Sequence, residues 1–443
     1  MKLKSFPKGG IHPPHKKNSA YNRDDLNATI PSIAVIPLSQ HIGAPAKCIV
    51  SVGDILKEEE LIGEANGFVS ANIHSSIPGE VIEIKDVFLP SGRVSQAVVV
   101  KTQGEFSRLG KPQNITPWEN YSATEIISII NEMGIVGLGG ATFPTHVKVS
   151  VPPDFDLENL IINAAECEPY LSSDHVLMLE YGKEISTGLK ILKKVLSPKH
   201  ISVGMEINKQ DAGESLKKIF DQEDLKADIV FLKNKYPQGA EKNLVKAIVG
   251  KEIPSGKLPL SVGVVNLNIS TVYAIYEAVC LKRPLVERFV TVSGDAIKNP
   301  GVYRVRVGTS YRSLITECGG FVEDPVKVIS GGPMMGFTVF DLDTPVTKGT
   351  SGILALTKKE VKSAKTTNCL KCGRCVDGCP MGLVPSRLYK LISHNMYDQA
   401  VEEGLNDCVE CGSCAYNCPA HLFLVQQFRA GKSIYRRNQG SKK

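Results

Sequence analysis

Apolar positions change their period several times along the chain, and each change predicts a different kind of structure. Between residues 28 and 105, short β-branched runs are separated by turns rich in Gly, Pro and Asp, which predicts a small all-β unit. From residue 122 apolar residues follow helical spacing, and the chain to residue 284 then alternates apolar runs with amphipathic stretches. The apolar runs are 159–165, 200–206, 227–233 and 262–268. This alternation is typical of an α/β domain with a largely parallel sheet.

The flanking segments have other patterns. Residues 285–360 contain strand-like runs and one short helical stretch that ends at Gly319, which predicts an α+β unit of β-grasp size. From residue 361 the pattern is helical, and residues 385–404 are expected to form one amphipathic helix or a helix pair. The expected divisions are 1–27, an extended arm; 28–105, the β unit; 106–284, the α/β domain; 285–360, the α+β unit; 361–432, the helical module; and 433–443, a basic tail.

Eight of the 12 cysteines form two copies of the pattern C-x2-C-x2-C-x3-C-P. The first copy is Cys369, Cys372, Cys375 and Cys379, and the second is Cys408, Cys411, Cys414 and Cys418. This is the spacing of two-cluster ferredoxins, in which the fourth cysteine of each run ligates the other cluster. We therefore expect one [4Fe–4S] cluster on the first three cysteines of the first run plus Cys418, and a second on the first three of the second run plus Cys379. Two zinc ribbons are the alternative, but zinc sites usually use separated pairs.

Length and composition place the chain among multidomain globular proteins. Its 443 residues exceed one core, and 42% hydrophobic with 22% charged residues is ordinary. No apolar run reaches the length of a membrane span, and the N-terminus lacks the apolar region of a secretory signal, so we expect a soluble or peripheral cytoplasmic protein. The net charge of +6 is concentrated in acid-free ends before Asp24 and from Arg429 onward. These ends are either solvated or in contact with an anionic lipid face or acidic partner; no motif indicates nucleic-acid binding.

A glycine-rich segment, 137–148, follows the first predicted helix of the α/β domain. Gly137, Gly139 and Gly140 do not have the spacing of a dinucleotide-binding fingerprint, and no P-loop lysine follows them directly. Such a turn can present its amides to a phosphate, with Lys148 as a point charge, or it can be a plain turn.

Two acids follow the predicted strand 159–165. Glu166 and Glu168 lie at a strand end, where open α/β sheets bind ligands, although a solvated acidic loop is the alternative. Asp174 and His175 are expected only to begin a helix.

These two segments, GGATFPTHVK and NAAECEPYLSSDH, resemble motifs shared by the flavoprotein subunit of complex I, the flavin subunit of NAD-reducing hydrogenase and the RnfC subunit of the Rnf complex. The order of parts, an arm, a barrel resembling the lipoyl/biotinyl hybrid fold, a Rossmann-like α/β flavin domain, an SLBB-like β-grasp unit and two ferredoxin runs, is most similar to the RnfC subunit. The resemblance covers nearly the whole chain. The complex I subunit has only one cluster, and the cobalamin reductase of propanediol metabolism, a soluble flavin and iron–sulfur protein, lacks the barrel.

The resemblance implies site residues for FMN and NAD(H). FMN is expected against Gly137, Gly139, Gly140 and Lys148, with Asn163 and Glu166 near its ring and ribityl chain. Three further residues match a stretch that borders FMN and NADH, and two match a stretch near the flavin: Tyr236, Gly239 and Glu241, then Asn268 and Thr271. Phe143 and Glu168 match positions that contact the nicotinamide nucleotide. No catalytic acid or base is expected, because bound FMN exchanges the hydride.

The same resemblance implies an NAD-linked oxidoreductase subunit of a ferredoxin:NAD⁺ translocase complex. The expected partners are NAD(H), other subunits of the membrane complex and, through them, ferredoxin. The expected location is the cytoplasmic face of the cell membrane, as a peripheral protein. A soluble cobalamin-reductase-type protein is the alternative, and an adaptor with a vestigial flavin site is a further one.

Overall fold

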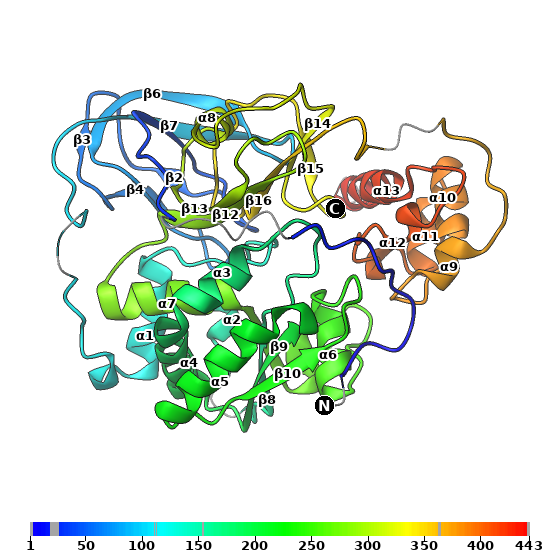
Figure 1. The fold of residues 1–443 in the computed structure, drawn as a ribbon, viewed down its shortest axis with the longest axis horizontal. Helices are drawn as coiled ribbons and strands as arrows, with labels where there is room; N and C mark the ends of the chain where they lie inside the picture. Colours follow the sequence, from blue (N-terminus) through cyan, green and yellow to red (C-terminus); the bar gives the residue numbers. More distant parts are fainter. Residues whose placement is uncertain are drawn as a thin grey trace.

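The computed structural model describes residues 3–17, 26–109, 111, 113–152, 155–361 and 365–440. It contains the β unit, the α/β domain, the α+β unit and the helical module that the sequence pattern predicts (Figure 1). In the described residues, no helix combines the length and the hydropathy that crossing a membrane requires.

The β unit consists of two small sheets packed around a shared core. Its strands are β1 (Ile33–Pro37), β2 (Lys47–Cys48), β3 (Ile55–Leu56), β4 (Leu61–Glu64), β5 (Ile73–His74), β6 (Gly79–Phe88) and β7 (Val94–Thr102). The sheet orders are β1-β7-β6-β3 and β2-β4-β5. Ile36, Ile62 and Val98 are fully buried between them, because alternate residues of each strand face inward.

The α/β domain has a four-stranded, fully parallel sheet in the order β10-β9-β8-β11. The strands are β8 (Asn159–Asn163), β9 (His200–Glu206), β10 (Asp228–Leu232) and β11 (Val264–Asn268), all within the predicted runs. The helices are η1 (Trp118–Asn120), α1 (Ala123–Glu132), α2 (Thr145–Val149), α3 (Ser173–Glu180), α4 (Gly182–Leu196), η2 (Ile207–Lys209), α5 (Gln210–Gln222), α6 (Glu241–Val249), η3 (Pro259–Val262) and α7 (Ile269–Leu281). Parallel strands covered by helices are buried on both faces, which explains their continuous apolar runs. Asn163 and Asn268, the last residues of β8 and β11, are register partners.

The α+β unit has a five-stranded sheet in the order β13-β12-β16-β14-β15. Its elements are β12 (Glu287–Ser293), β13 (Gly301–Arg306), α8 (Tyr311–Glu317), β14 (Lys327–Ser330), β15 (Phe337–Val339) and β16 (Gly352–Leu356). Tyr311 of α8 is fully buried against the sheet. The turn between β14 and β15 reaches the helical module, as described below.

The helical module consists of α9 (Arg374–Asp377), α10 (Pro385–Ser393), α11 (Tyr397–Glu402), η4 (Leu405–Asp407), α12 (Ser413–Tyr416) and α13 (Leu424–Gly440). The segment between the cysteine runs is therefore a helix pair, α10 and α11. Since α13 continues to Gly440, the expected boundary of a basic tail at residue 433 falls inside this helix.

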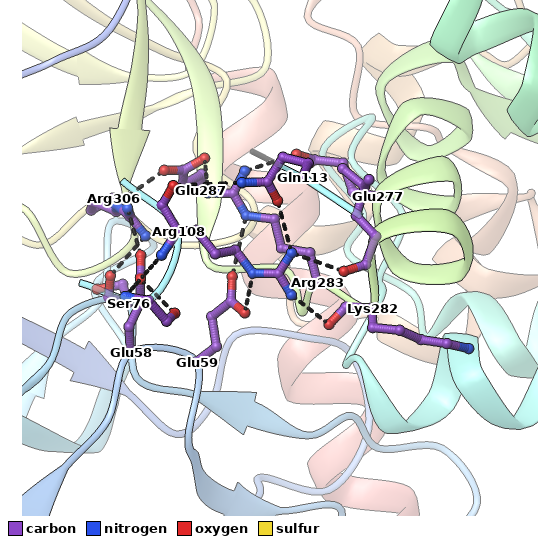
Figure 2. A network of polar contacts seen from close by, with 12 residues as sticks. Glu58, Glu59, Ser76, Arg108, Gln113, Glu277, Lys282, Arg283, Glu287 and Arg306 are labelled. Atoms are coloured by element: carbon purple, nitrogen blue, oxygen red, sulfur yellow. Dashed lines mark hydrogen bonds and ion pairs between the residues drawn. The ribbon is translucent and has the colours of Figure 1, made fainter. Parts of the chain in front are cut away.

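Buried ion pairs join three of these units through an arginine–glutamate network (Figure 2). Its members are Glu58, Glu59, Arg108, Glu277, Arg283, Glu287, Arg304 and Arg306. Glu287 of β12 lies between three guanidinium groups, at 2.6 Å from Arg304, 2.7 Å from Arg283 and 3.0 Å from Arg306. Arg306 also pairs with Glu58 of the β unit at 2.7 Å. The network fixes the β unit against the α+β unit and α7.

The described part of the arm, residues 3–17, is extended and lies between the α/β domain and the helical module (Figure 1). Lys4 forms a parallel bridge with Leu232 of the edge strand β10. Phe6 is buried, and Ile11 exchanges two backbone hydrogen bonds with Tyr236. These contacts show that the basic N-terminal segment, as far as residue 17, packs on the protein; residues 18–25 lie outside the described residues.

Candidate functional site

The glycine loop lies beside the carboxyl ends of β8 and β11. Its base is closed by the Gly137 amide, which donates to the Phe143 carbonyl at 2.8 Å, and by the Leu138 amide, which donates to Thr271 Oγ1 at 2.9 Å. At Gly139 an added Cβ would contact Asn268 at 3.3 Å. Gly140 has φ +103 with open space where a side chain would be, and it is exposed. The loop therefore presents bare backbone that a ligand can approach closely.

Two asparagines fix the loops that follow β8 and β11. Asn163 Nδ2 donates to the Gly239 carbonyl at 2.8 Å, which joins the expected flavin stretch around Tyr236 to β8. Asn268 Nδ2 donates to Asp174 Oδ2 at 2.8 Å, and Ser270 Oγ donates to the other carboxylate oxygen at 2.6 Å. Burial raises the pKa of Asp174 to about 6. The sequence suggested only a helix start for Asp174, because its partners lie about 95 residues further along the chain.

Glu166 is held in an unusual conformation beside this network. Its backbone has φ +42, a left-handed value that is uncommon for a non-glycine residue. One carboxylate oxygen accepts from the Asp174 amide at 2.8 Å. The other, Oε2, is buried without a hydrogen bond, with the Lys17 ammonium 3.8 Å away. A buried, unpartnered acceptor is what a ligand donor would satisfy.

Lys148 and Glu241 pair across the site at 2.7 Å, and both side chains are partly exposed. Glu241 is the first residue of α6, where a carboxylate is favoured by the helix dipole. The expected phosphate contact of Lys148 would compete with this pair, or share the ammonium with it.

Glu168 connects the strand-end loop to the α+β unit. Its two oxygens accept from the amides of Met334 and Met335, at 3.0 and 2.9 Å, in the turn between β14 and β15. The Tyr236 hydroxyl lies 3.4 Å from the same carboxylate. Burial raises the pKa of Glu168 to about 7. Phe143, the other residue expected to contact nicotinamide, is partly buried at the end of the glycine loop.

The second cysteine group lines one pocket. Cys408, Cys411 and Cys414 of the second run lie there with Cys379, the fourth cysteine of the first run. This is the grouping that the cross-over pattern predicts. Apolar side chains complete the wall: Val409, Leu383, Leu388, Val425 and Phe428. In the described residues no group of three or more His, Cys, Asp or Glu is arranged around a single metal ion. The shared pocket fits a four-thiolate cube.

The other expected group is more open to solvent. Cys369 and Cys372 are exposed, whereas Cys375 and Cys418 are intermediate. The two runs face each other here, because α9 contacts α12 and Asn417 donates to the Arg374 carbonyl at 3.5 Å.

The second run, in contrast, packs against the α/β domain and the α+β unit. The Tyr236 hydroxyl donates to the Cys411 carbonyl at 2.6 Å. A Cβ at Gly412 would lie 2.9 Å from the Met334 carbonyl. Arg429 of α13 pairs with Glu410 at 2.9 Å and donates to the Met335 carbonyl at 3.1 Å. Only the second group therefore borders the glycine loop's domain through described contacts of its own run.

Four family profiles match consecutive parts of the chain. The RnfC barrel sandwich hybrid domain matches residues 5–105, and the Nuo51 FMN-binding domain matches 130–277. The SLBB domain matches 289–338, and the 4Fe-4S dicluster domain matches 362–419. Together with the bare glycine loop and the cysteine pocket, they define a flavin and iron–sulfur electron-transfer protein.

Curated relatives resolve the family within that class. The chain is 47% identical to the RnfC-type subunit of the proton-translocating ferredoxin:NAD(+) oxidoreductase complex of Clostridium ljungdahlii, over 90% of this chain and 87% of the relative. It is 44% identical to the corresponding subunit of the Na(+)-translocating ferredoxin:NAD(+) oxidoreductase complex of Acetobacterium woodii, over 98% of both chains. The chain belongs to the RnfC family of Rnf complex subunits.

A solved structure shares the fold at much lower identity. A crystal structure of NAD+-reducing [NiFe]-hydrogenase in the H2-reduced state aligns with a TM-score of 0.53 and 17% identity, over 73% of this chain and 65% of that chain. The expected fold class, a hybrid barrel, an α/β flavin domain with a parallel sheet, an SLBB unit and a dicluster module, is confirmed.

Proposed function

We propose that this chain exchanges electrons with NAD(H) on behalf of an ion-translocating ferredoxin:NAD⁺ oxidoreductase complex. The observation that carries the proposal is one continuous packing unit that joins an FMN-type glycine loop to a four-cysteine pocket through Tyr236 and Cys411. A flavin can exchange a hydride with NAD(H) and single electrons with iron–sulfur clusters. Ferredoxin is the electron donor to the complex as a whole.

The glycine loop and the strand-end loops would hold FMN. Gly139 and Gly140 leave room for close approach, and Lys148 supplies a positive charge for the phosphate. Asn163 and Glu166 lie toward the ring and ribityl chain, where the free Glu166 Oε2 can accept a hydrogen bond. The remaining expected contacts are Gly137, Tyr236, Gly239, Glu241, Asn268 and Thr271 for FMN and its border with NADH, with Phe143 and Glu168 for the nicotinamide nucleotide.

We further propose an order for the two clusters. The cluster of Cys408, Cys411, Cys414 and Cys379 is the nearer one to FMN, because its run packs on the flavin domain. The cluster of Cys369, Cys372, Cys375 and Cys418 is the outer one, because two of its ligands are exposed. Electrons from the partner subunits would then enter at the outer cluster.

The chain is placed, in this proposal, as a peripheral subunit on the cytoplasmic face of the cell membrane, where its substrate NAD(H) is found. Co-purification with membranes that contain the other subunits, and its release by a salt wash, would support this location.

The first experiment is anaerobic purification followed by flavin, iron and sulfide analysis. About one FMN and about eight irons per chain are expected, with bleaching of the flavin by NADH in preference to NADPH. About eight irons with no flavin, even after reconstitution with FMN, would contradict the dehydrogenase function and leave a cluster-only adaptor.

The cluster order has its own test. The Cys411→Ala and Cys372→Ala variants are reduced anaerobically and mixed with NAD⁺, while reoxidation of the remaining cluster is followed by absorbance. We expect slow reoxidation when Cys411 is replaced, since the remaining outer cluster is far from the flavin, and rapid reoxidation when Cys372 is replaced. The opposite result would contradict the order.

A further inference from the structure

The N-terminal arm touches the nearer cluster's ligands directly. Gly9, with φ +60, lies so close to the backbone of Cys379 that an added Cβ would be 2.4 Å from its carbonyl carbon and oxygen. The Gly10 amide donates to the Gly378 carbonyl at 3.0 Å. The next residue, Ile11, pairs with Tyr236, whose hydroxyl holds Cys411. The arm therefore crosses the junction between the cluster pocket and the flavin domain.

The same arm ends inside the flavin site. The Tyr170 amide donates to the His15 carbonyl at 2.9 Å. Two residues further, Lys17 is only 5% exposed, and its ammonium donates to the carbonyls of Leu171 and Glu166, the latter at 2.7 Å. The Glu166 carboxylate lies 3.8 Å from the same ammonium.

A second buried lysine supports the adjacent peptide. Lys209 Nζ donates to the Ala165 carbonyl at 2.8 Å and is fully buried. Two ammonium groups thus hold the carbonyls of consecutive residues where Glu166 adopts its left-handed conformation. Lys209 comes from the α/β domain itself, whereas Lys17 reaches the loop only because the arm passes over it.

We propose that Lys17 is a positioning residue of the flavin site, supplied by an arm that also fixes the nearer cluster through Gly9 and Gly10. The inference rests on the proposed binding of FMN near Glu166. Lys17 holds the Glu166 backbone and supplies a countercharge to its buried carboxylate. A positive charge near a flavin favours the addition of electrons, so Lys17 raises both the affinity for FMN and the flavin reduction potential.

The test compares Lys17→Met with Lys16→Met, each in the full chain with clusters. Lys16 is the neighbouring lysine, and its ammonium is half exposed and only 3.9 Å from Asp295. The dissociation constant for FMN is measured by flavin fluorescence, and the flavin midpoint potential by anaerobic redox titration. For Lys17→Met we expect an FMN dissociation constant at least about tenfold higher and a potential shifted to more negative values. Lys16→Met should match the unmodified protein in both.

The readouts separate this role from simple stabilisation of the arm. A purely structural lysine would lower the unfolding temperature and leave the flavin potential of the bound fraction unchanged, and that result would overturn the proposal. Lys17→Gln keeps a hydrogen-bond donor but removes the charge, so it serves if Lys17→Met does not fold. An unchanged dissociation constant and potential in Lys17→Gln would also overturn the proposal. Failure of the unmodified protein to bind FMN would instead contradict the proposed function.

The cluster end of the arm is tested by Gly9→Ala. The matched control is Gly53→Ala, because Gly53 also has a positive φ, +95, but has open space at its Cβ position. We expect Gly9→Ala, and not Gly53→Ala, to weaken FMN binding and to slow NAD⁺-driven reoxidation of the clusters at unchanged iron content. Equal behaviour of the two variants would contradict the link between the arm's two ends.

Discussion

The Tyr236 hydroxyl donates a 2.6 Å hydrogen bond to the carbonyl of Cys411, and so connects the flavin domain to a cysteine 175 residues away in the chain. Tyr236 is 2% exposed, and its backbone is paired with Ile11 of the arm. Three segments from different parts of the sequence therefore meet where an electron would pass between a flavin and a cluster.

Replacing Tyr236 with Phe should loosen this junction. The buried Cys411 carbonyl would lose its donor, which costs about 1–3 kcal/mol of stability, and NAD⁺-driven reoxidation of the clusters should slow. Denaturant unfolding and anaerobic stopped-flow absorbance measure the two effects. Tyr170→Phe is the matched control, because Tyr170 bonds Glu360 at 2.7 Å away from the cysteine pocket. If both variants leave cluster reoxidation unchanged, the hydroxyl does not hold the junction.

Gly140→Ala should impair FMN binding through a steric effect. Both Gly140 and Gly250 have positive φ and open space at the Cβ position, so alanine at either site should cost about 1–2 kcal/mol of backbone strain. Gly250 ends α6 away from the loop. We expect the dissociation constant for FMN to rise at least about tenfold in Gly140→Ala alone. Equal FMN affinity in the two variants would show that the flavin does not approach Gly140.

The arginine–glutamate network should make stability depend on acid. Its guanidinium groups outweigh the effect of burial and lower the pKa of Glu287 to about 2. A lowered folded-state pKa stabilises the protein above the unfolded value of 4.5, and this stability is lost as the pH falls toward about 2. At neutral pH, Glu287→Gln should cost about 3–5 kcal/mol, because three arginines lose their countercharge.

That cost should shrink as the pH falls from about 4.5, by about 1.4 kcal/mol per pH unit, because protonated Glu resembles Gln. Urea unfolding between pH 7 and pH 3.5 measures it. Asp343→Asn provides the control, since Asp343 forms an exposed pair with Arg312. A difference between Glu287→Gln and the unmodified protein that stays constant with pH would contradict this account.

Glu168 should show the opposite dependence on pH. Burial raises its pKa to about 7, so the folded state binds a proton that the unfolded state has released between pH 4.5 and 7. The contribution of Glu168 to stability should therefore fall as the pH rises through this window. Relative to the unmodified protein, Glu168→Gln should become more stable from pH 5 to pH 7.5 in urea unfolding. A constant difference would show that Glu168 is ionised throughout, held by the Met334 and Met335 amides.

Local sequence was enough for most elements. Four apolar runs became the four parallel strands, and Ser122 with Glu125 formed the capping box that begins α1. The spacing of the cysteines grouped Cys379 with the second run, as the pocket has it. Such signals lie within a few residues of each other, so chain geometry alone relates them.

Contacts between distant segments were not predictable in this way. Asp174 was expected only to begin a helix, and for the basic N-terminus solvation and a partner contact both stayed open. In the structure Asp174 bonds Asn268 and Ser270, and Lys17 bonds Glu166 and Leu171. A lysine in an exposed-looking, proline-rich arm has no periodic pattern that indicates burial.

The sequence by itself determined the four kinds of unit, the cysteine grouping and the family motifs, because periodicity, spacing and local turns are properties of neighbouring residues. Only the tertiary structure decided that Glu168 is held by the turn between β14 and β15, that Cys411 faces Tyr236, and that Lys17 reaches Glu166. These contacts depend on how separate units pack, which is set by the shapes and charges of whole surfaces.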